Sequence, residues 1–179
     1  TGSGELGRGC QQASTPTRPQ QRLTEDLDMN KTVANDIHPQ LVNDCVLLGR
    51  FSLCHLLLCN DCNYPWFILV PARMDIREVY QLDANDRQQL LDESCQLSEF
   101  LMAHYGGDKL NVAALGNQVP QLHLHHIVRY ESDAAWPAPI WGKKIAQAYS
   151  PSAIDEIRNL FVGAGLAGYV SAPCCGSST

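Results

Sequence analysis

The sequence predicts one α+β domain on a mostly antiparallel sheet of five strands, with one long helix and a shorter C-terminal helix. Three observations support this class. Short apolar runs follow one another closely between residues 45 and 73, as strands joined by tight turns do. A long segment with helical spacing comes next. Two more strand-like runs then precede a last helical segment, and 179 residues suffice to bury a core.

The first three strands are expected at 45–51, 54–61 and 66–73. Their sequences are CVLLGRF, CHLLLCND and WFILVPAR. Each run is rich in apolar residues and too short for a typical helix. Ser52 separates the first two runs, and Pro71 stops the third because proline cannot donate a ladder hydrogen bond.

The long helix is expected to begin after Asp83, a favoured N-cap residue. Apolar residues recur at helical spacing from Leu90 to Tyr105. Gly106 and Gly107 follow, and glycine is the common residue just past a helix end. These signals bound the helix at both ends.

Two further strands, LNVAALGN at 110–117 and QLHLHHIVRY at 121–130, come after this helix. The last helix is expected over SAIDEIRNLF at 152–161, with Ser150 or Ser152 as its N-cap. The order is therefore three strands, a long helix, two strands and a terminal helix.

The ends of the chain differ from this core in composition. Residues 1–28 are rich in Gly, Thr, Gln, Pro and Ser, so we expect a disordered or non-native extension there. The domain is expected at 29–161. Residues 162–179 are again small and without pattern, and we expect a flexible tail.

Charge and composition exclude several classes of partner. The net charge is −6, which argues against a nucleic-acid or anionic-membrane binder because both need a basic surface. No apolar run approaches the roughly 20 residues of a membrane span. Several of the eight cysteines lie in apolar runs, and no signal peptide is apparent, so we expect reduced thiols and a cytoplasmic protein.

The strand at 121–130 carries three of the chain's six histidines, and side chains alternate across a strand. One face holds Gln121, His123, His125, Ile127 and Arg129. The other holds Leu122, Leu124, His126, Val128 and Tyr130. The second face is mostly apolar and is expected to pack in the core, with His126 as a hydrogen-bonded structural residue. The first face is expected to be open and to present two adjacent imidazoles.

Two adjacent imidazoles allow three interpretations. They can bind a metal such as zinc, they can act in nucleophilic catalysis at phosphorus, or they can simply lie on a histidine-rich surface strand. Cys59 and Cys62 form a C-x-x-C pair, which is half of a zinc site, but no second pair follows at a zinc-ribbon spacing. We therefore predict no metal and no cofactor.

The stretch NVAALGNQVPQLHLHHIVR resembles the signature of the histidine triad (HIT) superfamily of nucleotide hydrolases and transferases. There an Asn-bearing strand and a polar turn lead into His-φ-His-φ-His-φ-φ, where φ is apolar. The upstream NYPWFILVPAR is similar to the family's apolar strand that ends in proline and a basic residue. The resemblance covers about 36–141, and it implies a HIT-like fold that often forms a homodimer.

The resemblance also implies roles for individual residues. His123 falls on the nucleophile and His125 on the last histidine of the triad. Asn111, Asn117 and Gln118 match positions that hydrogen-bond phosphate and ribose.

Two positions depart from the family pattern. Gln121 stands where the first histidine is usual, and Trp66 where another histidine is usual. Trp66 and Arg129 are further candidates for substrate contact, with a core residue and a solvated charge as the plain alternatives. The pattern is most similar to bacterial HIT proteins described as diadenosine tetraphosphate hydrolase-like.

The predicted function is hydrolysis or transfer of a nucleotide at its α-phosphate, through a nucleotidyl-histidine intermediate on His123. His125 and Gln121 are predicted to assist catalysis as hydrogen-bond donors. Gln121 cannot shuttle a proton near neutral pH, so good leaving groups should be favoured. The alternatives are a nucleotide-binding or signalling module with little turnover, and a zinc-dependent hydrolase. The expected partner is a small nucleotide.

Overall fold

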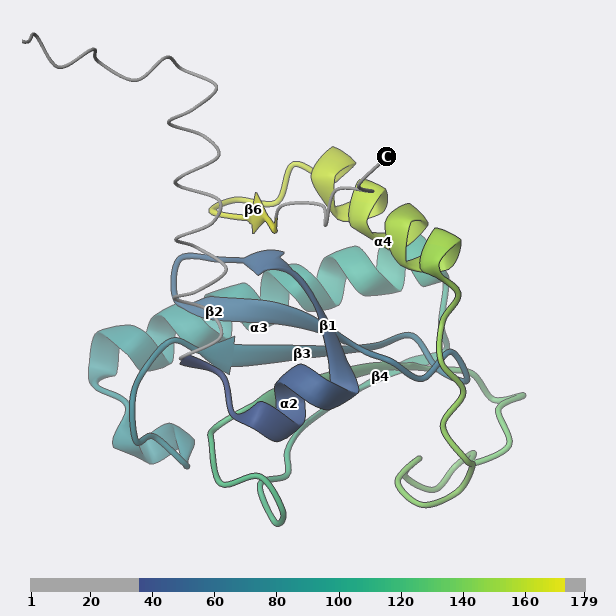
Figure 1. The fold of residues 1–179 in the computed structure, drawn as a ribbon, viewed down its shortest axis with the longest axis horizontal. Helices are drawn as coiled ribbons and strands as arrows, with labels where there is room; N and C mark the ends of the chain where they lie inside the picture. The colour runs from purple at the N-terminus through teal and green to yellow at the C-terminus, as the bar shows by residue number, and fades with distance from the viewer. Residues whose placement is uncertain (1–35, 173–179) are drawn as a thin grey trace, which may run out of the picture.

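A computed structural model of the chain describes residues 36–172; the expectations for residues 1–28 and for the end of the tail lie outside this range. The centre is a six-stranded antiparallel sheet with the order β4-β5-β3-β2-β1-β6 (Figure 1). The strands are β1 (Cys45–Arg50), β2 (Cys54–Cys59), β3 (Trp66–Pro71), β4 (Lys109–Ala114), β5 (Leu124–Arg129) and β6 (Val170–Ser171). The α+β class is confirmed.

Within residues 36–172, three α-helices and one short 3-10 helix accompany the sheet. They are α2 (Pro39–Asp44), η1 (Val79–Gln81), α3 (Ala84–Tyr105) and α4 (Pro151–Gly163). No helix within residues 36–172 has the length and apolar content that crossing a membrane requires.

The helix ends follow the capping signals in the sequence. The side chain of Asp83 accepts a hydrogen bond from the Asp86 amide at 2.9 Å and so caps α3. Gly106 takes a left-handed conformation (φ 60°) just past its end, where glycine has no Cβ to clash. Ser150 caps α4 by accepting from the amide of Ala153 at 3.2 Å. The predicted bounds of α3 are thus confirmed.

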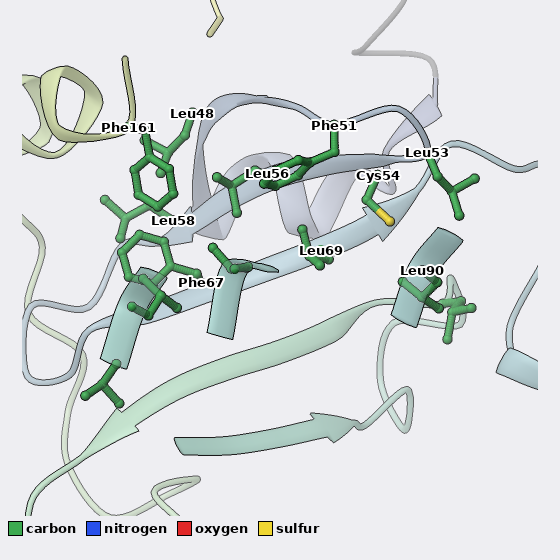
Figure 2. Packing of buried hydrophobic residues seen from close by; sticks show 14 of the residues in the cluster. Leu48, Phe51, Leu53, Cys54, Leu56, Leu58, Phe67, Leu69, Leu90 and Phe161 are labelled. Carbon is green, nitrogen blue, oxygen red and sulfur yellow. The ribbon is translucent and has the colours of Figure 1, made fainter. Parts of the chain in front are cut away.

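The helices lie on both faces of the sheet, with α3 across one face and α2 on the other (Figure 1). The larger core lies between the sheet, α3 and α4. Figure 2 shows part of it, where the rings of Phe67 on β3 and Phe161 on α4 are 5.4 Å apart. This packing leaves the α2 face of the sheet free to form the functional site.

Three features differ from the sequence-based expectation. The sheet has a sixth strand, because residues 170–171 pair with Gly49 and Arg50, so this part of the expected tail is ordered. The helix α2 was not expected, since its six residues are too few to show a helical period. The histidine strand begins at Leu124 rather than at residue 121, because the chain before it forms a turn that closes the pocket described below.

Candidate active site

A pocket of about 660 Å³ lies on the sheet face opposite α3. Its walls come from α2 and the start of β1, from the first half of β3, from the turn at 115–119, and from the loop at 139–142. His123 and His125 both line it, together with Asn117 and Gln118 of the turn. Segments that are far apart in the sequence therefore meet around the two histidines.

The alternation predicted for the histidine strand is confirmed. Val128 packs in the core toward α3, and the Nε2 atom of His126 lies 2.7 Å from the hydroxyl of Ser94 on α3. The other face is not open, however, and that expectation was wrong. His123 is 5% and His125 6% exposed, because the turn and the loop cover the strand and leave the imidazoles in a pocket wall.

The ring of His123 is held in one orientation by a backbone hydrogen bond. Its Nδ1 lies 2.6 Å from the carbonyl oxygen of Gln121. A carbonyl can only accept, so Nδ1 carries the proton and the lone pair of a neutral ring is on Nε2. Within residues 36–172, Nε2 of His123 makes no hydrogen bond and is not among the fully buried polar atoms without a partner, so it is exposed to the pocket that His123 lines. This is the protonation pattern that a nucleophile needs.

The ring of His125 is held in the opposite protonation pattern. The indole nitrogen of Trp66 donates to its Nδ1 at 2.9 Å. An indole N–H can only donate, so Nδ1 of His125 is the acceptor and Nε2 carries the proton. Burial, with smaller contributions from His123 and His126, lowers the pKa of His125 to about 3. At neutral pH this ring is therefore an uncharged hydrogen-bond donor.

The strand register explains how Trp66 reaches His125. Trp66 is paired with Ile127 and Ile68 with His125, so Trp66 and His125 are diagonal neighbours on one face of β3 and β5. Diagonal neighbours on a sheet are within reach of large aromatic side chains. The rings of His123 and His125 are themselves 4.9 Å apart and nearly perpendicular. The arrangement places a nitrogen lone pair and an N–H donor side by side.

The pocket contains few charges. Among the described residues its lining includes no Lys or Arg, and its one acidic residue is Asp44. A smaller pocket of about 150 Å³ adjoins it and shares Asn117 and His123. Arg77 and Glu78 line this smaller pocket. A cation is thus present beside His123, although none lines the main pocket.

Comparisons with known proteins show the family of the chain. The family model for the HIT domain matches residues 40–132, which is more than half of the chain. The chain belongs to the HIT family. A comparison with curated proteins gives no match.

Three solved structures of histidine triad proteins resemble this HIT protein. One from Marinobacter aquaeolei VT8 is 50% identical, with a TM-score of 0.69, and the match covers 70% of this chain and 91% of the other. One from Bradyrhizobium japonicum is 40% identical, with a TM-score of 0.69 and coverages of 70% and 94%. One from Sinorhizobium meliloti 1021 is 36% identical, with a TM-score of 0.69 and coverages of 70% and 93%. The HIT-like fold expected from the sequence is thereby confirmed.

The structure gives Gln121 a different role from the one predicted. Its side-chain oxygen accepts from the amide of His38 at 2.7 Å, and its side-chain nitrogen donates to the carbonyl of Asp36 at 2.6 Å. Gln121 does not line the main pocket. Both ends of the amide are therefore used to hold the segment that leads into α2, and only its backbone carbonyl acts on His123. Gln121 also lines the smaller pocket that His123 shares.

Asn111 and Arg129 do not reach the pocket either. Arg129 is 1% exposed and pairs with Asp133 through two hydrogen bonds of 2.7 and 3.0 Å. Its remaining nitrogen donates to the side chain of Asn111 at 2.7 Å. The guanidinium has no free edge for a substrate, so neither residue is carried into the proposal below. Both instead fix the loop that follows β5.

Other pocket residues were missed by sequence analysis. Trp141 lies against Trp66 and His125, with ring centroids 5.9 and 5.5 Å away, and it closes one side of the pocket. Asp44, the last residue of α2, and Cys45, the first residue of β1, also line the pocket. The sequence carried no signal for α2. Within residues 36–172 no group of three or more residues could hold a metal ion.

The lowered pKa values predict a loss of stability in acid. Burial lowers the pKa of His126 to about 4, and that of His125 is about 3. As the pH falls below about 6.5, these residues take up protons in the unfolded chain but not in the folded protein, so stability falls. Between pH 7.5 and pH 5 the free energy of unfolding should drop by about 2 kcal/mol for each of them.

Urea unfolding at the two pH values measures this loss. The variant His125→Gln should show about half of the loss attributed to the pair, because one of the two groups is gone. An unfolding free energy that stays constant between pH 7.5 and pH 5 would show that both rings titrate normally.

Proposed function

We propose that this HIT protein is a nucleotide hydrolase or nucleotidyltransferase that forms a covalent intermediate on His123. The observation that supports this most directly is the bond from Nδ1 of His123 to the Gln121 carbonyl. It fixes the lone pair on Nε2, in the wall of a pocket of about 660 Å³ that can hold a nucleotide.

The proposed reaction has two steps at one phosphorus atom. In the first, the Nε2 lone pair of His123 forms an N–P bond to the α-phosphate while the bond from phosphorus to the leaving group breaks. The leaving group takes that electron pair. In the second, water attacks the same phosphorus and loses a proton to solvent, the electron pair of the N–P bond returns to Nε2 of His123, and a nucleoside monophosphate is released. Each step needs aligned atoms and hydrogen-bond donors around the phosphate oxygens.

His125 supplies one of these donors. Its Nε2–H lies beside His123 and is available because Nδ1 is occupied by Trp66. A neutral imidazole gives up its last N–H proton far less readily than an imidazolium does, and the low pKa of His125 keeps it neutral. His125 thus stabilises the charge that develops on the phosphate oxygens without protonating the leaving group.

The rest of the pocket suits the other parts of a nucleotide. Leu41 and Ile68 offer an apolar surface, and Trp141 adds an aromatic one, for a base. The carboxylate of Asp44 is a hydrogen-bond acceptor that suits a sugar hydroxyl. Asn117 fits the phosphate oxygens through its amide N–H groups. A phosphate bound here is held by neutral donors.

The leaving group is inferred from the same chemistry. Because neither His125 nor Gln121 can protonate it, a group that is stable as an anion should leave fastest. Arg77 lines the same small pocket as His123 and supplies a cation for such a group, with Glu78 in the same lining. A phosphate or polyphosphate leaving group, as in a dinucleoside polyphosphate, therefore fits better than an amine.

A second candidate function is a nucleotide-binding or signalling module with little turnover. Gln121 favours this alternative, because it replaces a residue that could move protons and is itself fully engaged with the backbone. Binding of a nucleotide without product formation would identify such a module. No observation among the described residues favours the zinc-dependent hydrolase.

The homodimer and the cytoplasmic location remain predictions. β4 is an edge strand of the sheet, and Val112 on it is 48% exposed. An edge strand with exposed apolar side chains is a surface that a second copy can extend by strand pairing.

Replacing His123 tests the proposed intermediate. The wild-type protein should convert diadenosine tetraphosphate to AMP, and the variant His123→Ala should lower kcat by roughly 1,000-fold or more because the nucleophile is lost. His104→Ala is the matched control, since His104 is an exposed histidine on α3. Mass spectrometry of acid-quenched wild-type protein should locate a nucleotide on the peptide that contains His123. Turnover that survives in His123→Ala would contradict the mechanism.

Comparing two substrates tests the inferred leaving group. Diadenosine tetraphosphate should be cleaved with a kcat/KM roughly tenfold or more above that of adenosine 5′-phosphoramidate, whose leaving group is an amine. Arg77→Gln should reduce turnover of the first substrate and spare the second. Arg50→Gln is the control, because Arg50 is exposed and lines neither pocket. Faster cleavage of the phosphoramidate by the wild-type protein would overturn this inference.

A further inference from the structure

Two cysteines face each other in the wall of the nucleotide pocket. Cys45 is the first residue of β1 and Cys59 the last residue of β2, and the strand register pairs them directly. Both side chains line the pocket and are partly exposed. They lie on the same face of the sheet as Ile68 and Trp66. A bound nucleotide would therefore contact both thiols.

The backbone pairing places these thiols close enough for a disulfide bond. The neighbouring pair is hydrogen-bonded, because the amide of Asn60 donates to the carbonyl of Asp44 at 3.0 Å. Hydrogen-bonded and non-hydrogen-bonded pairs alternate in an antiparallel ladder, so Cys45 and Cys59 form a non-hydrogen-bonded pair. In such pairs the Cα atoms are about 4.5 Å apart, within the range of about 4.4–6.8 Å that disulfides adopt.

The two thiols also contact each other in the reduced protein. A hydrogen bond with Cys45, together with burial, raises the pKa of the Cys59 thiol above its usual range. These surroundings favour the protonated form of Cys59 in the reduced protein.

We propose that Cys45 and Cys59 form a reversible disulfide, with a low-molecular-weight disulfide such as oxidised glutathione as the oxidant. One thiol of the pair, as its thiolate, attacks one sulfur of oxidised glutathione, which forms a mixed disulfide and releases one glutathione thiolate. The other thiol then loses its proton to solvent and attacks the protein sulfur of the mixed disulfide, which releases the second glutathione. Two protein thiols are oxidised, and one glutathione disulfide is reduced to two thiols.

The other described cysteines lie in different surroundings. Cys54 is buried on the opposite face of β2, within the core that faces α3. Cys62 and Cys95 are exposed, and neither lines the pocket. Cys62 lies three residues after Cys59 and is the competing partner for it.

The functional consequence rests on the proposed nucleotide site. A nucleotide that occupies the pocket covers both sulfur atoms of the reduced pair, and a disulfide changes the shape of the wall that it contacts. Nucleotide binding and disulfide formation are therefore coupled, and each should disfavour the other. Oxidation of the pair lowers nucleotide occupancy of the pocket.

The full-length protein, equilibrated in glutathione buffers of increasing oxidised fraction, tests this proposal. After alkylation, peptide mapping by mass spectrometry should find a Cys45–Cys59 link in the wild type and in the control Cys95→Ser. The link should be absent in Cys45→Ser and Cys59→Ser. Saturating AMP should lower the linked fraction at least threefold in a buffer that gives half oxidation.

The possible contrary results are distinct. A wild-type map with no Cys45–Cys59 link in any buffer, or with only a Cys59–Cys62 link, overturns the proposal. A link whose fraction does not respond to bound AMP overturns the coupling. Calorimetry of AMP with the reduced protein, run in parallel, separates this failure from failure of the proposed function, because AMP must bind the reduced protein for the function to hold.

Discussion

Two hydrogen bonds give the neighbouring imidazoles of this HIT protein opposite protonation patterns, and the proposed chemistry depends on them. The Gln121 carbonyl fixes the proton of His123 on Nδ1, and the Trp66 indole fixes that of His125 on Nε2. Both partners can play only one role in a hydrogen bond, so each partner fixes which nitrogen of the neutral ring carries the proton. One ring thereby offers a lone pair and the other an N–H.

Burial keeps His125 uncharged at neutral pH. Removing His125 from water disfavours its protonated form, and the rings of His123 and His126 nearby add to this effect. The loop that provides this burial is anchored by Arg129, which pairs with Asp133 and donates to the carbonyl of Ala138 at 3.0 Å. The same loop continues to Trp141, whose ring lies against His125 in the pocket wall. A buried ion pair outside the site thus shapes the environment in which the histidines work.

The sequence predicted the fold and the orientation of the histidine strand because both follow from local periodicity. The alternation that separates His126 from His125 needs only the two-residue repeat of a strand. The roles of Gln121 and Arg129 could not be predicted in this way. Gln121 binds backbone atoms of His38 and Asp36, 83 and 85 positions away, and Arg129 joins a neighbouring strand to a loop. A polar residue on a reactive face can therefore either contact the substrate or support the fold. Its spacing in the sequence does not show which of these two roles it has.

Nitrogen-15 NMR of the imidazole rings tests the central claim most directly, because the two nitrogens of each ring report which one carries the proton. At pH 7 we predict protonated Nδ1 for His123 and protonated Nε2 for His125, with the second pattern weakened in the variant Trp66→Phe. The same protonated nitrogen in both rings, or a positively charged His125 at pH 7, would contradict the account.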